Sequence, residues 1–199
     1  MKNFIAPMER LVNQLSKLPG VGKKTAQRYA YHIINSDSIF ARELSESIID
    51  AKTNIHYCTR CGNFTDKELC DVCAAPDRQS IICVVKEPKD VSAMEKVKDF
   101  NGTYHVLHGV INPLENKGPN DLNIKSLLTR LNKEKTSEVI IATNPDVEGE
   151  ATAIYLANII KPLGIKVSRI AQGISMGSEL EYQDAVTLSH ALENRVRMD

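Results

Sequence analysis

Four of the five cysteines form two CxxC pairs, Cys58-x-x-Cys61 and Cys70-x-x-Cys73, separated by eight residues. Each pair can direct two thiolates at one ion, and two pairs complete the tetrahedron that zinc prefers. Four thiolates leave no position for water or substrate, so the spacing predicts one structural zinc per chain. A redox dithiol is the alternative. Cys83 lies in an apolar stretch and is expected to be a small buried hydrophobe.

A second group of residues suits phosphate. Gly20 and Gly22 separate two stretches with helical periodicity, Lys23 and Lys24 follow directly, and Arg28 falls near the same helical face. The start of a helix offers unpaired N–H donors and the positive end of its dipole. A phosphate bound there carries no base readout, so we expect DNA binding that is independent of sequence. The alternative is an ordinary turn between helices with solvated lysines.

Three carboxylates, Asp146, Glu148 and Glu150, follow an apolar stretch at 139–142 and open a predicted helix. In open α/β sheets, ligands bind at the carboxyl ends of the strands. Carboxylates at that place are typical of a hard-cation site, such as one for Mg²⁺.

The hydrophobic pattern indicates the elements that hold these groups. Apolar residues at helical spacing predict one helix ending at Pro19-Gly20, a second after Gly22 and a third from about residue 36. The second helix is expected to bury Ala26, Tyr29, Ala30, Ile33 and Ile34. Symmetric association through both ends of the chain would bury Leu11, Leu15, Leu188 and Leu192.

From residue 80 the pattern changes to short apolar, β-branched stretches that alternate with helical ones. Strands are predicted at 81–85, 103–107, 139–142 and 165–170, and helices at 90–98, 121–132, about 150–161 and 187–197. This alternation predicts an α/β fold with a parallel sheet. The segment 109–120, rich in glycine and proline, is predicted to be a long loop.

The chain has 25 basic and 25 acidic residues, so net charge predicts no nucleic-acid partner. Residues 1–35 nevertheless hold six basic residues and only one acidic residue, Glu9. This excess of positive charge indicates that the N-terminal end is the part of the chain that would contact DNA. No apolar stretch approaches the roughly 20 residues that span a bilayer. The first residues lack the apolar core of a signal peptide, and we expect a cytoplasmic protein with no membrane partner.

Two resemblances follow from these residues. Leu18-Pro-Gly-Val-Gly-Lys23 is similar to the helix-hairpin-helix DNA-binding motif, and the acidic loop resembles the Toprim domain of topoisomerases, primases and nucleases. The Toprim family places a glutamate after its first strand, where this chain has Lys86 when aligned on Pro88, and an aspartate where it has Asn144. Both changes remove negative charge from a Mg²⁺ site.

The order of helix-hairpin-helix, four-cysteine zinc site, Toprim domain and short tail resembles the RecR family of recombination mediators over nearly the whole chain. The stretch 142–152 is especially close to that family, as is 173–182, which has been likened to a Walker B motif but has no Walker A loop beside it. Four regions are expected: 1–55 helix-hairpin-helix, 56–77 four-cysteine zinc module, 78–175 Toprim and 176–199 C-terminal tail.

The resemblance implies a non-catalytic protein of recombinational DNA repair. It implies action with RecO and RecF to load recombinase on gapped or single-stranded DNA, and a homo-oligomer, either a dimer or a ring tetramer. Asp146, Glu148 and Glu150 are expected to offer an acidic surface to a basic partner. Two alternatives are a Mg²⁺-dependent Toprim nuclease or topoisomerase-like enzyme, and a zinc-stabilised adaptor that does not bind DNA.

Overall fold

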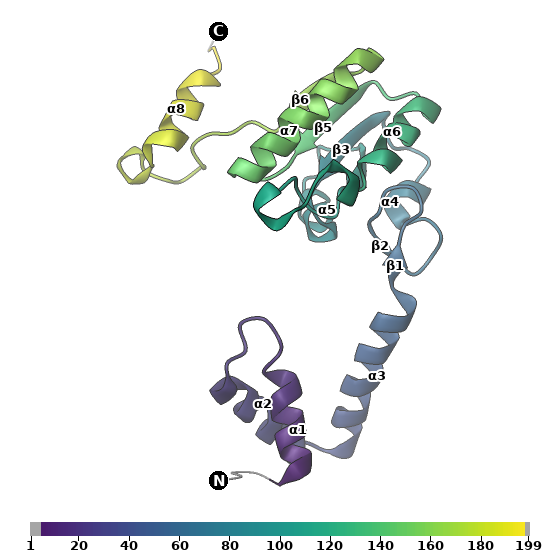
Figure 1. The fold of residues 1–199 in the computed structure, drawn as a ribbon, viewed down its shortest axis with the longest axis vertical. Coiled ribbons are helices and arrows are strands. Elements are labelled where there is room, and N and C mark those ends of the chain that lie inside the picture. The colour runs from purple at the N-terminus through teal and green to yellow at the C-terminus, as the bar shows by residue number, and fades with distance from the viewer. Residues whose placement is uncertain (1–4, 198–199) are drawn as a thin grey trace. The chain divides into compact units, whose positions relative to one another are not determined.

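The computed structural model describes residues 5–197, which form two compact units that divide between Ile55 and His56 (Figure 1). The first unit contains three helices: α1 (Ala6–Leu15), α2 (Lys23–Asn35) and α3 (Ser38–Asn54). α1 and α2 pack together around Met8, Val12, Ala26 and Ala30. The turn between them requires Gly20, whose φ of 77° is a left-handed conformation that favours glycine.

The predicted burial of Tyr29 and Ile34 is wrong for the single chain. Tyr29 is 42% exposed and Ile34 is 54% exposed, whereas Ala26 and Ala30 are fully buried. Two helices cover only one stripe of each other, and the small alanines occupy that stripe. α3 begins at the side-chain cap of Asp37, which accepts from the Phe40 N–H at 2.7 Å, and none of its 17 residues is buried.

The second unit opens with a small hairpin of β1 (His56–Tyr57) and β2 (Phe64–Thr65), followed by the short helix α4 (Asp71–Ala74). A four-stranded parallel sheet follows, with the strand order β4-β3-β5-β6. Its strands are β3 (Ile81–Val85), β4 (Thr103–Val106), β5 (Glu138–Ala142) and β6 (Lys166–Arg169). The predicted α/β class with a parallel sheet is therefore confirmed.

Both faces of the sheet are covered, as its apolar strands require. α6 (Ile124–Lys133) and α7 (Val147–Ile160) pack on the face that carries Ile82, Val84 and Ile141 (Figure 1). α5 (Pro88–Met94) packs on the opposite face with Cys83 and Val85. Alternate residues of β3 thus serve two separate cores. Cys83 is buried, as expected of a small hydrophobe.

Several helix boundaries differ from the prediction. α5 starts at Pro88, where the Asp90 carboxylate accepts from the Glu87 N–H at 2.7 Å and caps the first turn. α7 starts at Val147, since Asp146 accepts a hydrogen bond from the Gly149 N–H and so caps the helix. The segment 109–120 contains the short 3₁₀ helix η1 (Pro113–Glu115) and most of a second one, η2 (Pro119–Asp121).

Beyond β6 the chain holds the 3₁₀ helix η4 (Leu180–Tyr182) and the last helix α8 (Ala185–Glu193). α8 starts two residues before the predicted 187 and ends four residues before the predicted 197. Its start is fixed by Asp184, whose carboxylate accepts from the N–H groups of Val186 and Thr187. None of the helices among residues 5–197 is long and apolar enough to cross a bilayer.

Candidate metal centre and nucleic-acid interface

The four paired cysteines converge into one buried cluster. Their sulfur atoms all lie within 4.8 Å of one another. Cys58 and Cys61 come from the β1–β2 hairpin, Cys70 lies directly before α4, and Cys73 lies within it. Hydrogen bonds from the thiols of Cys61 and Cys73 lower the pKa of Cys70, whereas the pKa of Cys61 is raised by the same cluster, so one thiolate is favoured among the four sulfurs.

This cluster fits zinc and a structural role. The donor set is four sulfurs, the thiols are buried, and no fifth protein ligand is needed. The Asn63 N–H also donates to the Cys61 Sγ at 3.4 Å, a contact from the surrounding backbone that orients a ligand sulfur. The prediction of one structural zinc per chain is confirmed.

The segment that carries the cysteines, residues 56–75, covers the outer edge of the sheet, and we call it the zinc module. The Val106 N–H of edge strand β4 donates to the Cys61 carbonyl at 2.8 Å. Gly62 lies so close to the sheet that a Cβ there would be 2.8 Å from the His108 Nε2. The metal-binding hairpin is therefore bonded directly to the backbone of the parallel sheet.

An ion network fastens the same junction. Glu134 at the end of α6 accepts from the Arg60 Nε at 2.8 Å and from the Arg130 Nε at 3.0 Å. The Arg130 side chain is only 4% exposed, and it also donates to the Tyr104 carbonyl of β4 at 2.7 Å. Burial opposes ionisation of Glu134, but the two guanidinium groups outweigh it and hold the pKa of this carboxyl below its ordinary value.

The three carboxylates of the acidic loop do not converge on one point. Asp146 caps α7, and Glu150 forms an ion pair with Arg169 of β6. The Glu148 side chain forms no hydrogen bond or ion pair with any residue in 5–197. In the same described range, the four cysteines are the only group of three or more potential ligands that comes together.

A cavity of about 410 Å³ lies beside this loop, at the carboxyl ends of β5 and β6. It is lined by the amides of Asn144 and Gln172 and by part of α8, including His190. Lys86, at the position where Toprim enzymes carry a glutamate, lies 3.9 Å from the Glu87 carboxylate. The residues that line the cavity include amides but no carboxylate, whereas a Mg²⁺ site needs carboxylates.

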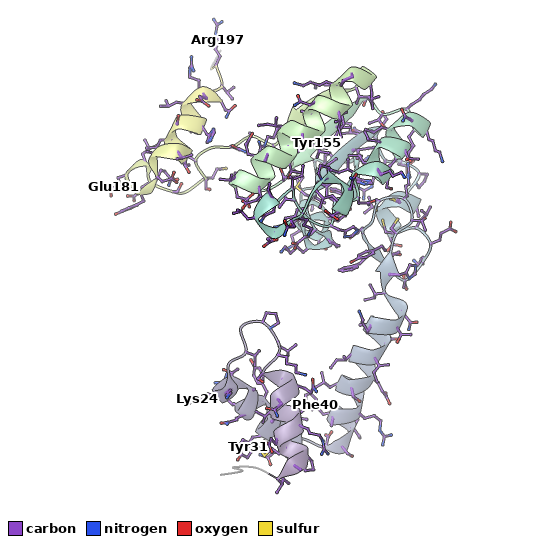
Figure 2. The ribbon with its side chains drawn as sticks, viewed as in Figure 1. Lys24, Tyr31, Phe40, Tyr155, Glu181 and Arg197 are labelled. Atoms are coloured by element: carbon purple, nitrogen blue, oxygen red, sulfur yellow. The ribbon has the colours of Figure 1, made fainter. Side chains whose placement is uncertain are left out.

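The glycine turn of the first unit leaves the start of α2 open. Gly22 supplies no side-chain cap, and no acidic residue occupies the first turn. Lys23 and Lys24 form no ion pair with any other residue described by the structure, and Arg28 lies over the Tyr29 ring at 5.8 Å. Figure 2 shows Lys24 on α2 and Phe40 on the adjoining α3.

Comparison with family models accounts for this architecture segment by segment. Residues 8–52 match the RecR helix-hairpin-helix, residues 55–75 the RecR four-cysteine zinc finger domain, residues 80–171 the Toprim domain and residues 173–196 the RecR C-terminal region. Three of the four matches are specific to RecR, and they occur in the order expected from the sequence. The chain belongs to the RecR family.

Membership in the RecR family brings a recombination-mediator role in DNA repair. It also places the open start of α2 inside the helix-hairpin-helix match, since that match includes Gly20 and Gly22. The acidic loop lies inside the Toprim match, and the Walker B-like stretch at 173–182 opens the C-terminal match.

Sequence reasoning about this RecR chain missed several residues that shape the sites. Arg169 was not paired with Glu150, and Arg60, Arg130 and Glu134 were not connected. Arg60 and Glu134 are 74 positions apart, so no local periodicity relates them. A charged residue within an amphipathic helix was the one available signal, because Arg130 lies on the apolar face of α6 beside Leu127 and Leu131.

Proposed function

We propose that this chain is a non-catalytic, DNA-binding recombination mediator that acts in the cytoplasm with RecO and RecF to load recombinase on gapped or single-stranded DNA. The observation that carries the proposal is the open start of α2, flanked by two lysines without ion-pair partners in the described range, within a RecR-type helix-hairpin-helix.

Lys23, Lys24 and Arg28 are proposed to contact phosphates, with Gly20 and Gly22 allowing the backbone to approach. The first N–H groups of α2 have no intrahelical acceptors, and no side chain substitutes for them. A phosphate oxygen can accept from these donors while the lysines neutralise its charge. None of these groups reads a base edge, so binding should be equal on unrelated sequences.

The test is a salt titration of DNA binding with Lys23→Ala, using Lys161→Ala in the second unit as a matched control. Each lost phosphate contact should reduce the slope of log affinity against log salt by about 0.7 to 0.9. The control should retain the parental slope. An unchanged slope in Lys23→Ala would favour the alternative, an ordinary turn between helices whose lysines are solvated.

The competing proposal, a Mg²⁺-dependent Toprim nuclease or topoisomerase, is less well supported. Glu150 is already neutralised by Arg169, Asp146 serves as a helix cap, and Lys86 adds positive charge. We expect no strand cleavage or relaxation with Mg²⁺ or Mn²⁺. Nicking that disappears in Glu148→Ala would establish the enzyme instead.

The acidic loop is proposed to bind a basic partner, RecO by family resemblance. Asp146, Glu148 and Glu150 lie at the start of α7, where Glu148 has no ion-pair partner in the described residues. Glu148→Ala should therefore weaken capture of RecO more than Glu150→Ala, because Glu150 already has a partner in Arg169. Equal capture by both variants and the parent would contradict this assignment.

Homo-oligomerisation, as a dimer or ring tetramer, is the last part of the proposal. Five large apolar side chains of α3 are exposed in the single chain, namely Ile39, Phe40, Leu44, Ile48 and Ile49. In α8, Leu192 is exposed. A second copy covering these faces would remove apolar surface from water.

A further inference from the structure

The zinc module carries an exposed pair of aromatic rings that the metal site does not use. Tyr57 of β1 and Phe64 of β2 are cross-strand neighbours, so their side chains share one face of the hairpin. Their rings are nearly parallel, with a 10° angle between planes and centroids 5.5 Å apart. Tyr57 is 55% exposed and Phe64 is 54% exposed. Two large rings are thus held side by side with much of their surface in water.

The inner end of this pair is anchored to the Toprim domain. The ring of His108 lies 4.2 Å from the Tyr57 ring. His108 has a positive φ of 61°, which is uncommon for a residue other than glycine. The absence of a side chain at Gly62 lets the hairpin lie against the His108 ring. The Tyr57 ring thus contacts the His108 ring, which is tilted by 51° to it, on one side and the nearly parallel Phe64 ring on the other. We call this row of three rings the ladder, with Phe64 at its outer end.

A positive charge stands at the inner end of the ladder. The Lys117 Nζ donates to the main-chain carbonyl of His108 at 3.4 Å, and burial together with the charge of this ammonium group lowers the pKa of the His108 ring. Lys117 forms no ion pair with any other residue of the described range. Aromatic rings beside a cation match a nucleotide strand, in which bases stack on rings and phosphates meet the charge.

We propose that Tyr57 and Phe64 form a stacking platform for unpaired bases of single-stranded DNA, with Lys117 contacting an adjoining phosphate. The bases of a duplex are stacked on one another and cannot occupy such a platform without unpairing. The platform therefore selects unpaired DNA over a duplex. The helix-hairpin-helix is proposed to make a different kind of contact, with phosphates, which does not depend on sequence. This inference rests on the proposed function, because it assumes a DNA-binding protein.

The first experiment compares DNA affinities by fluorescence anisotropy. The full chain, Phe64→Ala and Phe64→Tyr are titrated with an oligothymidylate, an abasic oligomer of the same length and a duplex. Loss of one stacked base should weaken oligothymidylate binding about fivefold to a hundredfold in Phe64→Ala. Phe64→Tyr keeps the ring and should keep the affinity. Zinc content measured for each variant shows that the zinc module remains folded.

A second measurement reports stacking directly. The chain has no tryptophan, so Phe64→Trp introduces a single tryptophan at the outer end of the ladder, and its fluorescence can be excited apart from that of the six tyrosines. Oligothymidylate should quench this fluorescence, and the abasic oligomer should not. The matched control is Leu163→Trp, which places the ring at an exposed position after α7, at the opposite end of the strands. Its fluorescence should be unchanged by either oligomer.

Lys117→Ala completes the test. It should reduce the slope of log affinity against log salt for oligothymidylate by about 0.7, because one phosphate contact is lost. Phe64→Ala should leave that slope unchanged. Equal oligothymidylate affinity in Phe64→Ala and the parent would overturn the platform, as would an equal loss on the duplex. A change of oligomeric mass in Phe64→Ala would also overturn it, by assigning the rings to an interface. Failure of the parent to bind any DNA would instead refute the proposed function.

Discussion

At the scale of single residues, charge placement decides what the acidic loop can do. The guanidinium of Arg169 reaches Glu150 from the neighbouring strand β6, and Asp146 is committed to the backbone of α7. Only Glu148 of the three remains without an ion-pair or hydrogen-bond partner for its carboxylate in the described residues. This arrangement supports the proposal that the acidic loop contacts a basic surface rather than a hard cation.

His105 of β4 is another residue whose surroundings set its protonation. Its ring is fully buried, and Nε2 lies 2.8 Å from the Asn123 carbonyl. Because a carbonyl can only accept, Nε2 must carry the proton of the neutral ring. Nδ1 has no hydrogen-bond partner in the described residues. Burial lowers the pKa of His105 to about 4.

This pKa predicts a pH dependence of stability. The unfolded chain takes up a proton at His105 near pH 6.5, whereas the folded chain does so only near pH 4, so stability falls as pH drops between those values. The loss between pH 7 and pH 5 should be about 2 kcal/mol. His105→Gln should remove that part of the acid sensitivity. Urea unfolding of zinc-loaded parent and variant at both pH values measures it, and parallel losses would contradict the assignment.

Arg130 and Arg60 contact the same carboxylate but differ in burial, which gives a second prediction. Glu134→Gln removes the counter-charge of the buried Arg130 and should cost about 3 kcal/mol, within the range for breaking a buried pair. Arg60 is about one-third exposed, so Arg60→Ala should cost about 1 kcal/mol. Denaturant unfolding midpoints give both values. Equal losses would mean that burial of Arg130 has no energetic consequence.

At the scale of elements, the zinc module acts as the cover of a sheet edge. Strand β4 is the outermost strand on its side, and an uncovered edge presents unpaired N–H and carbonyl groups. The Cys61 carbonyl accepts from the Val106 N–H, and Arg130 donates to the Tyr104 carbonyl. We therefore expect the metal to stabilise this edge of the Toprim sheet as well as its own loop.

Zinc removal is accordingly predicted to affect both elements. Cys70→Ser should lower zinc content from one to none per chain and increase hydrogen exchange at the amides of β4, including Val106. The amides of β5, in the middle of the sheet, should change less, because β3 and β6 still pair with it. Elemental analysis and hydrogen-exchange mass spectrometry test this. Full protection of β4 in the zinc-free variant would show that the cover does not depend on the metal.

The elements also show what sequence can predict. The β-branched stretch at Ile81–Val85 and the CxxC spacing are local patterns, and both gave the correct element and site. The Tyr57–His108 contact and the Glu150–Arg169 pair depend on segments brought together only by the folded chain. Periodicity likewise overestimated the burial of Tyr29 and Ile34, because it marks an apolar face without showing whether another element covers it.

At the scale of the whole molecule, exposed apolar faces point to association. α3 contributes no residue to the core of its own unit, yet it carries Ile48 at 62% exposure. We expect light scattering at tens of micromolar to give a mass that is a multiple of the 22.1 kDa chain. Ile48→Glu should lower this mass, while Glu46→Gln on the same helix should not. A parent mass equal to one chain, with and without DNA, would exclude a ring.

The main-chain hydrogen bond from Val106 to Cys61 also has a consequence for folding during synthesis of the chain. A ribosome delivers the chain from its N-terminus, so residues 56–75 emerge well before β4. The short zinc module can bind its metal while the strands are still being made, and β4 then meets an acceptor that is already in place. In a cell short of zinc, the nascent sheet would present a bare edge to neighbouring chains, and the yield of protein would fall through aggregation before any DNA was encountered.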